Sequence, residues 1–260
     1  MQTQAGSLAA PATDKNFLGV GIGFSGPQGT FAPDAAPPDT NGAVGDTQYV
    51  QWVNESFAVF DKATGAVVYG PAAGNTLFQN MGGHDCQTTN DGDPIVQYDK
   101  AAKRWIMTQF AVSGGSPYYQ CIAISATSDA TGLYYRYAAE QPYFNDYPKL
   151  GVWPDAYYMT FNMFSFFFVG ARACALDRAK MLAGQSATMQ CYQFSSTIDS
   201  LLPADLDGST PPPAGSPNYL LNYQSDQNSL RLWKFHADFV NSGNSYLTGP
   251  TSMPVAAFSE

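Results

Sequence analysis

The sequence predicts an all-β fold, a β-propeller-like domain of about four repeated four-stranded blades. Aromatic residues make up 14% of the chain and charged residues only 13%, whereas ordinary soluble domains carry ~25% charged residues. Strands favour aromatic side chains, and 24 glycines with 18 prolines supply many turns. Similar segments also recur at a nearly constant interval, which is typical of propeller blades.

The repeats set the expected strands. Asp39, Asp93 and Asp146 each open a unit, at intervals of 54 and 53 residues. A short apolar run, an aromatic-rich strand, a second strand and an Asp-to-Gly turn follow each aspartate. The runs that we expect to form strands lie at 48–53, 57–60, 95–99, 104–110, 121–126, 157–162, 171–177, 219–223 and 230–236.

These repeats define a propeller domain at residues 34–260, preceded by an N-terminal arm at 1–33 that is either loose or covers a sheet edge. The expected units are about 39–92, 93–145, 146–206 and a weaker 207–260. A plain β-sandwich with coincidental spacing is the alternative fold. Residues 255–260 resemble the start of another strand, which leaves an incomplete ring as a further alternative.

Helical signals are sparse. We expect one short helix at 177–183, with Asp177 as its N-cap and Gly184 after its end. Residues 201–217 contain three consecutive prolines and are expected to form a surface loop. We expect three tryptophans to pack between neighbouring blades, where burial of each large side chain stabilises the fold by ~1.5–3 kcal/mol: Trp105, Trp153 and Trp233.

The four cysteines indicate the compartment. Their even number and the lack of a Cys-x-x-Cys pair favour two disulfides over a metal site. We expect the pairs Cys86–Cys121 and Cys174–Cys191, the second because its short separation suits neighbouring strands; four buried thiols are the alternative. The first seven residues resemble a mature chain with an added start codon, so we expect a secreted protein, extracellular or periplasmic.

The charge excludes several partners. Net charge is −9 and no basic run is present, which argues against nucleic acid and against an anionic membrane surface. The longest apolar stretch is too short to span a bilayer. Unpaired sheet edges can pair with a second copy of the chain, so a homo-oligomer remains an alternative.

The leading aspartates are the candidate catalytic residues. In a propeller, Asp39, Asp93 and Asp146 would converge at the mouth of the central channel, with Asp205 or Asp207 as further members. Clustered carboxylates raise one another's pKa, which gives the acid and base that glycoside cleavage requires. The cluster would alternatively bind Ca²⁺, or each aspartate would only cap a turn. We assign turn formation to Asp61, Asp129, Asp177 and Asp238.

Other residues near the mouth are candidates for binding substrate. Tyr147 and Trp153 offer flat rings for stacking on sugars, and Lys149 is a polar neighbour. His84 is placed on a loop near Asp93, although a hydrogen-bonded loop histidine is the simpler interpretation. No metal ligands are assigned.

Several segments resemble a known family. The sequence Asp93-Pro94-Ile95-Val96-Gln97-Tyr98-Asp99, the run Ala123–Tyr134 and the segment Asp146–Met159 look like blade openings and turns of the arabinanase and β-xylosidase type of five-bladed propeller hydrolase. The resemblance implies that Asp93 or Asp39 is the general base and Asp146 a modulator of pKa. The whole chain more closely resembles secreted bacterial propeller-like proteins of unassigned activity.

One departure from that family concerns the glutamate that acts as its general acid. The chain has three glutamates; we expect Glu55 and Glu140 in turns between strands, and Glu260 is the last residue. We expect a secreted, carbohydrate-active relative of glycoside hydrolases, with no cofactor assigned and Ca²⁺ in the acidic cluster left open. The alternatives are a non-catalytic propeller that binds a glycan or a protein, and a fragment of a larger propeller enzyme.

Overall fold

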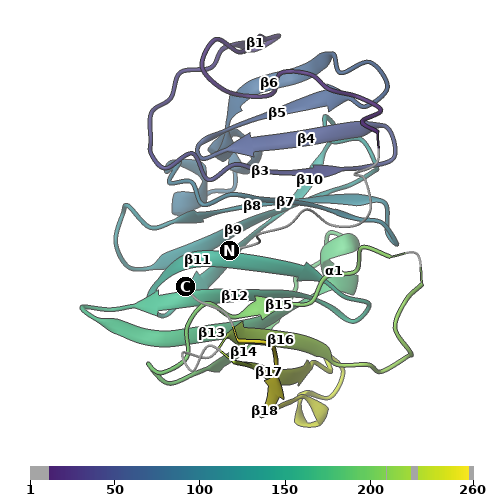
Figure 1. The fold of residues 1–260 in the computed structure, drawn as a ribbon. Coiled ribbons are helices and arrows are strands. Elements are labelled where there is room, and N and C mark those ends of the chain that lie inside the picture. Colours follow the sequence, from purple (N-terminus) through teal and green to yellow (C-terminus); the bar gives the residue numbers. More distant parts are fainter. Residues whose placement is uncertain (1–11, 209, 224–227, 258–260) are drawn as a thin grey trace.

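The computed structural model describes residues 12–208, 210–223 and 228–257 and shows an all-β protein (Figure 1). Its strands form four antiparallel four-stranded sheets, each made of four consecutive strands. The first two sheets consist of β3 (Asn41–Val44), β4 (Gln48–Val53), β5 (Ser56–Asp61) and β6 (Val67–Ala73), and of β7 (Ile95–Asp99), β8 (Arg104–Ala111), β9 (Tyr118–Ser125) and β10 (Tyr134–Gln141).

The third and fourth sheets repeat this pattern. They consist of β11 (Phe144–Val152), β12 (Ala156–Phe164), β13 (Phe168–Asp177) and β14 (Met189–Gln193), and of β15 (Leu202–Pro203), β16 (Asn218–Tyr223), β17 (Ser229–His236) and β18 (Tyr246–Pro254). A small hairpin of β1 (Ser25–Gly26) and β2 (Gly29–Thr30) lies against β6. The short helices are α1 (Arg178–Leu182) and 3₁₀ turns at Gly74–Phe78, Asp85–Gln87 and Ser242–Asn244.

The sheets follow one another in space as they do in sequence, from the first at the top of Figure 1 to the fourth at the bottom. The first strands of successive sheets lie side by side: β3 contacts β7, β7 contacts β11, and β11 contacts β15. The starts of these four strands therefore gather in one region of the molecule.

Each gap between neighbouring sheets is filled by an apolar cluster. In the second sheet, alternate residues of β8 face different neighbours: Trp105 packs toward the first sheet and Ile106 toward the third. Successive side chains of a strand point to opposite faces, so a sheet covered on both sides needs a continuous apolar run. Trp105, Trp153 and Trp233 are all buried in such clusters, as predicted.

The N-terminal arm covers the outer face of the first sheet. Phe17 and Phe24 pack against Phe60, and Phe31 packs against the same cluster, in which Val20 is buried. Of the two alternatives for the arm, the described residues 12–33 therefore show a covering segment, and residues 1–11 lie outside the described part of the chain.

The predicted turns and disulfides are present. Asp61, Asp129, Asp177 and Asp238 each accept backbone N–H groups in turns, from Thr64, Thr131, Lys180 and from Val240 with Asn241, respectively. The Asp177 carboxylate thus caps α1, as predicted. The disulfides are Cys86–Cys121 and Cys174–Cys191, and the prediction of both is confirmed.

The fourth sheet begins earlier than expected. Its first strand, β15, lies at Leu202–Pro203, inside the segment predicted to be loop, so the predicted start at residue 207 is too late. β15 has two residues and contains a proline, so it carries no recognisable strand pattern. Glu140 likewise lies within strand β10 rather than in a turn.

Candidate functional site

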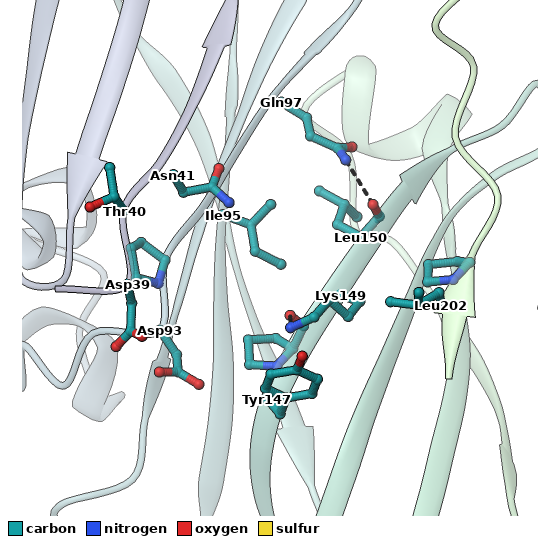
Figure 2. A pocket seen from close by; sticks show the side chains of 13 residues that line it. Asp39, Thr40, Asn41, Asp93, Ile95, Gln97, Tyr147, Lys149, Leu150 and Leu202 are labelled. Atoms are coloured by element: carbon teal, nitrogen blue, oxygen red, sulfur yellow. Dashed lines mark hydrogen bonds between the residues drawn. The ribbon is translucent and has the colours of Figure 1, made fainter. Parts of the chain in front are cut away.

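A pocket of about 350 Å³ lies near the starts of the four first strands (Figure 2). Asn41 begins β3, Asp39 and Asp93 lie two residues before β3 and β7, and Tyr147 with Lys149 comes from β11. In Figure 2 the Asp39 and Asp93 carboxylates lie on one side of the pocket, facing Tyr147 and Lys149. The remaining lining residues are Thr40, Pro94, Ile95, Gln97, Pro148, Leu150, Leu202 and Pro203.

The backbone conformation at the start of each first strand repeats more regularly than the sequence does. Asp39, Asp93, Tyr147 and Ser200 have φ values of 38°, 48°, 52° and 47°. Each lies two residues before the paired part of its first strand; in β11 this part resumes at Lys149 after a bulge. Asp tolerates this left-handed conformation, whereas it is uncommon for a bulky residue such as Tyr147. The position expected for Asp146 is therefore held by Tyr147.

Asn54, in the turn between β4 and β5, positions Asp39. Its amide Nδ2 donates to the Asp39 Oδ2 at 3.2 Å and to the Pro37 carbonyl at 2.6 Å. A Cβ atom on Gly92 would lie 1.9 Å from the Asn54 Oδ1, and Gly92 has a φ of 90°. Glycine at residue 92 thus lets the chain before Asp93 pass directly over Asn54, which brings the two aspartates to the same pocket.

Asp93 is the perturbed acid of the pocket. Burial raises the pKa of its carboxyl, and the charges of Asp39 and Asp146 raise it further. The backbone N–H of Tyr147 and the ammonium of Lys149 act in the opposite direction without reversing the shift. Asp146 therefore acts on Asp93 through its charge, although the lining of the pocket includes Asp39 and Asp93 and not Asp146.

Lys149 places one positive charge among these carboxylates. Its Nζ lies 3.2 Å from the centre of the Tyr147 ring and donates to the Pro148 carbonyl at 3.0 Å. Burial lowers the pKa of Lys149, while Asp93, Asp146 and Asp39 oppose that change. The ammonium thus lies against the Tyr147 ring and within electrostatic reach of the three aspartates.

Amide side chains connect the first strands below the mouth. The Asn41 Oδ1 accepts the backbone N–H of Val96 at 2.9 Å, and the Gln97 Nε2 donates to the Leu150 carbonyl at 2.7 Å (Figure 2). The Oε1 of Gln97 is buried and has no hydrogen-bond partner among the described residues. Gln97 therefore brings an unused acceptor to the lining of the pocket.

Other predicted site residues lie elsewhere. Trp153 is buried between the third and fourth sheets, and its Nε1 donates to the Ser216 carbonyl at 2.9 Å. His84 packs edge-on against Tyr119 with ring centres 5.3 Å apart, and is not part of the pocket lining. Neither assignment to the pocket holds, because Trp153 follows the far end of β11 and His84 belongs to the loop before Asp85.

The expected aspartates of the fourth unit also lie away from the mouth. Asp205 accepts the Val152 N–H at 2.7 Å, and Asp207 pairs with Lys100 at 3.5 Å. Both line a neighbouring pocket further along β3 and β7. They follow β15, whereas the mouth lies at its start.

The described residues do not form a metal centre or a membrane span. In ranges 12–208, 210–223 and 228–257, no group of three or more histidine, cysteine, aspartate or glutamate side chains is arranged to hold a metal ion. None of the helices within these ranges combines the length and apolar character needed to cross a membrane.

Asn54, Asn41 and Gln97 belong to this site but are not among the site residues that the sequence predicts. Asn41 and Gln97 lie close to the leading aspartates in sequence, so the repeat itself was a signal for them. Asn54 gave no comparable signal, because only the folded turn brings it to Asp39. The chain matches no protein-family model, no curated protein and no solved structure.

Proposed function

We propose that the protein is a secreted β-propeller-type protein that binds a carbohydrate at the pocket of Asp39 and Asp93 and hydrolyses its glycosidic bond. The propeller arrangement is supported by four meandering four-stranded sheets whose first strands are neighbours. Two disulfides support a secreted protein.

One observation carries the hydrolytic function: aspartates from two successive sheets meet at a single pocket, and one of them has a raised pKa. Glycoside cleavage requires a carboxylic acid that gives a proton to the leaving oxygen and a carboxylate that assists water or attacks the sugar. Asp93 takes the acid role because burial and neighbouring charges favour its protonated form. Asp39, which accepts a hydrogen bond from Asn54, takes the role of carboxylate.

The remaining lining suits a polyhydroxylated ligand. Asn41, Thr40, Gln97 and Lys149 supply donors and acceptors, and the exposed ring of Tyr147 supplies a flat apolar surface. Such a combination of few polar groups around an aromatic ring orients sugars.

A non-catalytic glycan-binding protein is the second candidate. It is favoured by the position of the glutamates: Glu55 lies in the turn between β4 and β5, Glu140 lies in β10, and neither is part of the pocket lining. The glutamate acid of arabinanase-like enzymes therefore has no counterpart among the described lining residues.

A panel of aryl glycosides and short oligosaccharides tests the proposal. The wild type should cleave at least one of them, and Asp93→Asn or Asp39→Asn should lower kcat/KM by at least ~100-fold, the usual effect of losing a general acid or base. Asp14→Asn, at an exposed residue of the N-terminal arm, is the matched control and should keep full activity. Cleavage that survives both pocket variants would refute the catalytic assignment, and binding without any turnover would favour the second candidate.

A further inference from the structure

The hairpin between β12 and β13 ends in two exposed aromatic rings. Phe166 is 98% exposed and Phe167 is 83% exposed. Burial of a phenylalanine side chain is favourable by about 1.5–3 kcal/mol, so a ligand that covered these two adjacent rings would gain that free energy. Neither ring takes part in the aromatic contacts of the core.

The tip of this hairpin, Phe166 and Phe167, follows strand ends that belong to an aromatic cluster. Phe164 and Phe168, at the ends of the two strands, lie 5.3 Å apart between ring centres, and Phe164 lies 6.2 Å from Phe144. Phe144 in turn contacts Phe110 and Tyr118 of the second sheet. The strand ends that carry the hairpin are therefore packed by aromatic side chains from two sheets, while Phe166 and Phe167 themselves stay in solvent.

The tip and the pocket lie at the same end of the third sheet. Asp146 pairs with Asn162 and Phe144 with Phe164, so β12 runs from the level of the pocket toward the tip. Lys149, which lines the pocket, pairs with Thr160; the strand from Thr160 to Phe164 spans roughly 13 Å, and Phe166 lies in the turn beyond it. Tyr143 and Tyr147 are both partly exposed at this end. Exposed aromatic side chains thus lie both at the pocket and at the hairpin, at the same end of the third sheet.

The charge around the tip favours a neutral ligand. The chain has no lysine or arginine between Lys149 and Arg172, and its net charge is −9. Segments that dock on membranes combine apolar tips with basic residues that attract anionic lipid, and this hairpin lacks them. Flat rings beside a pocket rich in hydrogen-bonding groups suit the apolar faces of sugars in a neutral chain.

We infer that Phe166 and Phe167 form a docking site for a polysaccharide whose chain extends into the Asp39–Asp93 pocket. This inference rests on the proposed carbohydrate function and adds the size of the ligand to it. A polymer contacts both the rings and the pocket, and the two contacts strengthen each other through the high effective concentration of linked sites. Short oligosaccharides reach only the pocket.

Co-sedimentation with insoluble xylan, cellulose and chitin tests the inference. The wild type should be retained on at least one polymer, and the double variant Phe166→Ala/Phe167→Ala should lose at least tenfold in affinity. The double change Phe166→Trp/Phe167→Trp should keep retention, since it keeps flat rings. Leu133→Ala/Val240→Ala is the matched control, because these side chains are 82% and 100% exposed in turns at the opposite end of the sheets; it should bind like the wild type.

Three results would overturn the docking site: a wild type retained on none of the polymers, alanine variants retained as well as the wild type, or tip-dependent binding to phosphatidylcholine vesicles or self-association in place of polymer retention. Comparing retention on polymers with cleavage separates this inference from the hydrolytic function. Retention that depends on the rings without cleavage by the wild type would reject hydrolysis alone. Cleavage of short glycosides without retention would reject the docking site alone.

Discussion

Arg178 holds Asp99 through two hydrogen bonds across the boundary between the second and third sheets. Nε lies 2.7 Å from Oδ2, and Nη2 lies 3.0 Å from Oδ1. The hydroxyl of Tyr157 donates to the same Oδ2 at 2.9 Å. The Asp99 side chain is fully buried and that of Arg178 is 15% exposed. The pair joins the end of β7 to the start of α1, so it fixes how two sheets meet.

Removing one member of this pair should be costly. Arg178→Met leaves the Asp99 carboxylate buried without its cation, and we expect a loss of about 3–5 kcal/mol in the free energy of unfolding. Urea denaturation measures it. Lys103→Met is the matched control: it removes an exposed pair with Asp46 at 3.0 Å and should change stability little. If Arg178→Met behaved like this control, the pair would not hold the two sheets together.

The same pair should set the acid limit of stability. Burial alone would raise the pKa of Asp99, but hydrogen bonds from Arg178 and from the Ala102 backbone outweigh it and hold the pKa below the ordinary value. A depressed pKa means that the stabilisation is present above the unfolded pKa, ~3.9, and is lost as pH falls below it. The free energy of unfolding should fall in this acid range, and Asp99→Asn should flatten that fall. An equally steep fall in the variant would assign it to other carboxyls.

The disulfides should contribute according to the loops they close. Cys86–Cys121 spans 35 residues and Cys174–Cys191 spans 17. Loop-closure entropy gives about 4 kcal/mol for the first and about 3 kcal/mol for the second. Paired Cys→Ser variants, compared by urea denaturation without reductant, should follow this order. Equal stability of variant and wild type would show that the bond is not formed in solution.

Sequence reasoning predicted what periodicity and local chemistry determine. The Asp39 and Asp93 openings, the capping role of Asp177 and the Cys174–Cys191 disulfide follow from residue spacing and from side chains that act within a few residues. Cys86–Cys121 is the pair that remains once Cys174 and Cys191 are joined. The residues that hold the leading position of the third and fourth repeats do not follow from spacing. A bulge moves the equivalent position from Asp146 to Tyr147, and Ser200 replaces an aspartate in the fourth sheet. Asn54 reaches Asp39 only through tertiary packing, and Trp153 is buried because the fourth sheet packs against the third.

Asp93 should be a residue that lowers stability at neutral pH. Its pKa is raised first by burial and then by Asp39 and Asp146, so its contribution to stability is greatest below the unfolded pKa and is lost as pH rises through the folded pKa. Asp93→Asn keeps the shape without the charge, and asparagine also tolerates the left-handed backbone. We expect the variant to unfold at a higher temperature than the wild type at pH 7, with the difference shrinking toward pH 4. A lower melting temperature at pH 7 would contradict the raised pKa.

The meeting of the leading acids at one pocket is tested most directly by a carboxyl ¹³C NMR titration of Asp93. In the wild type Asp93 should titrate above the ordinary aspartate value; Asp39→Asn and Asp146→Asn should each lower its pKa, and Lys149→Met should raise it. An Asp93 that titrates at the ordinary value and ignores all three substitutions would show that Asp39, Asp146 and Lys149 do not lie close enough to act on it.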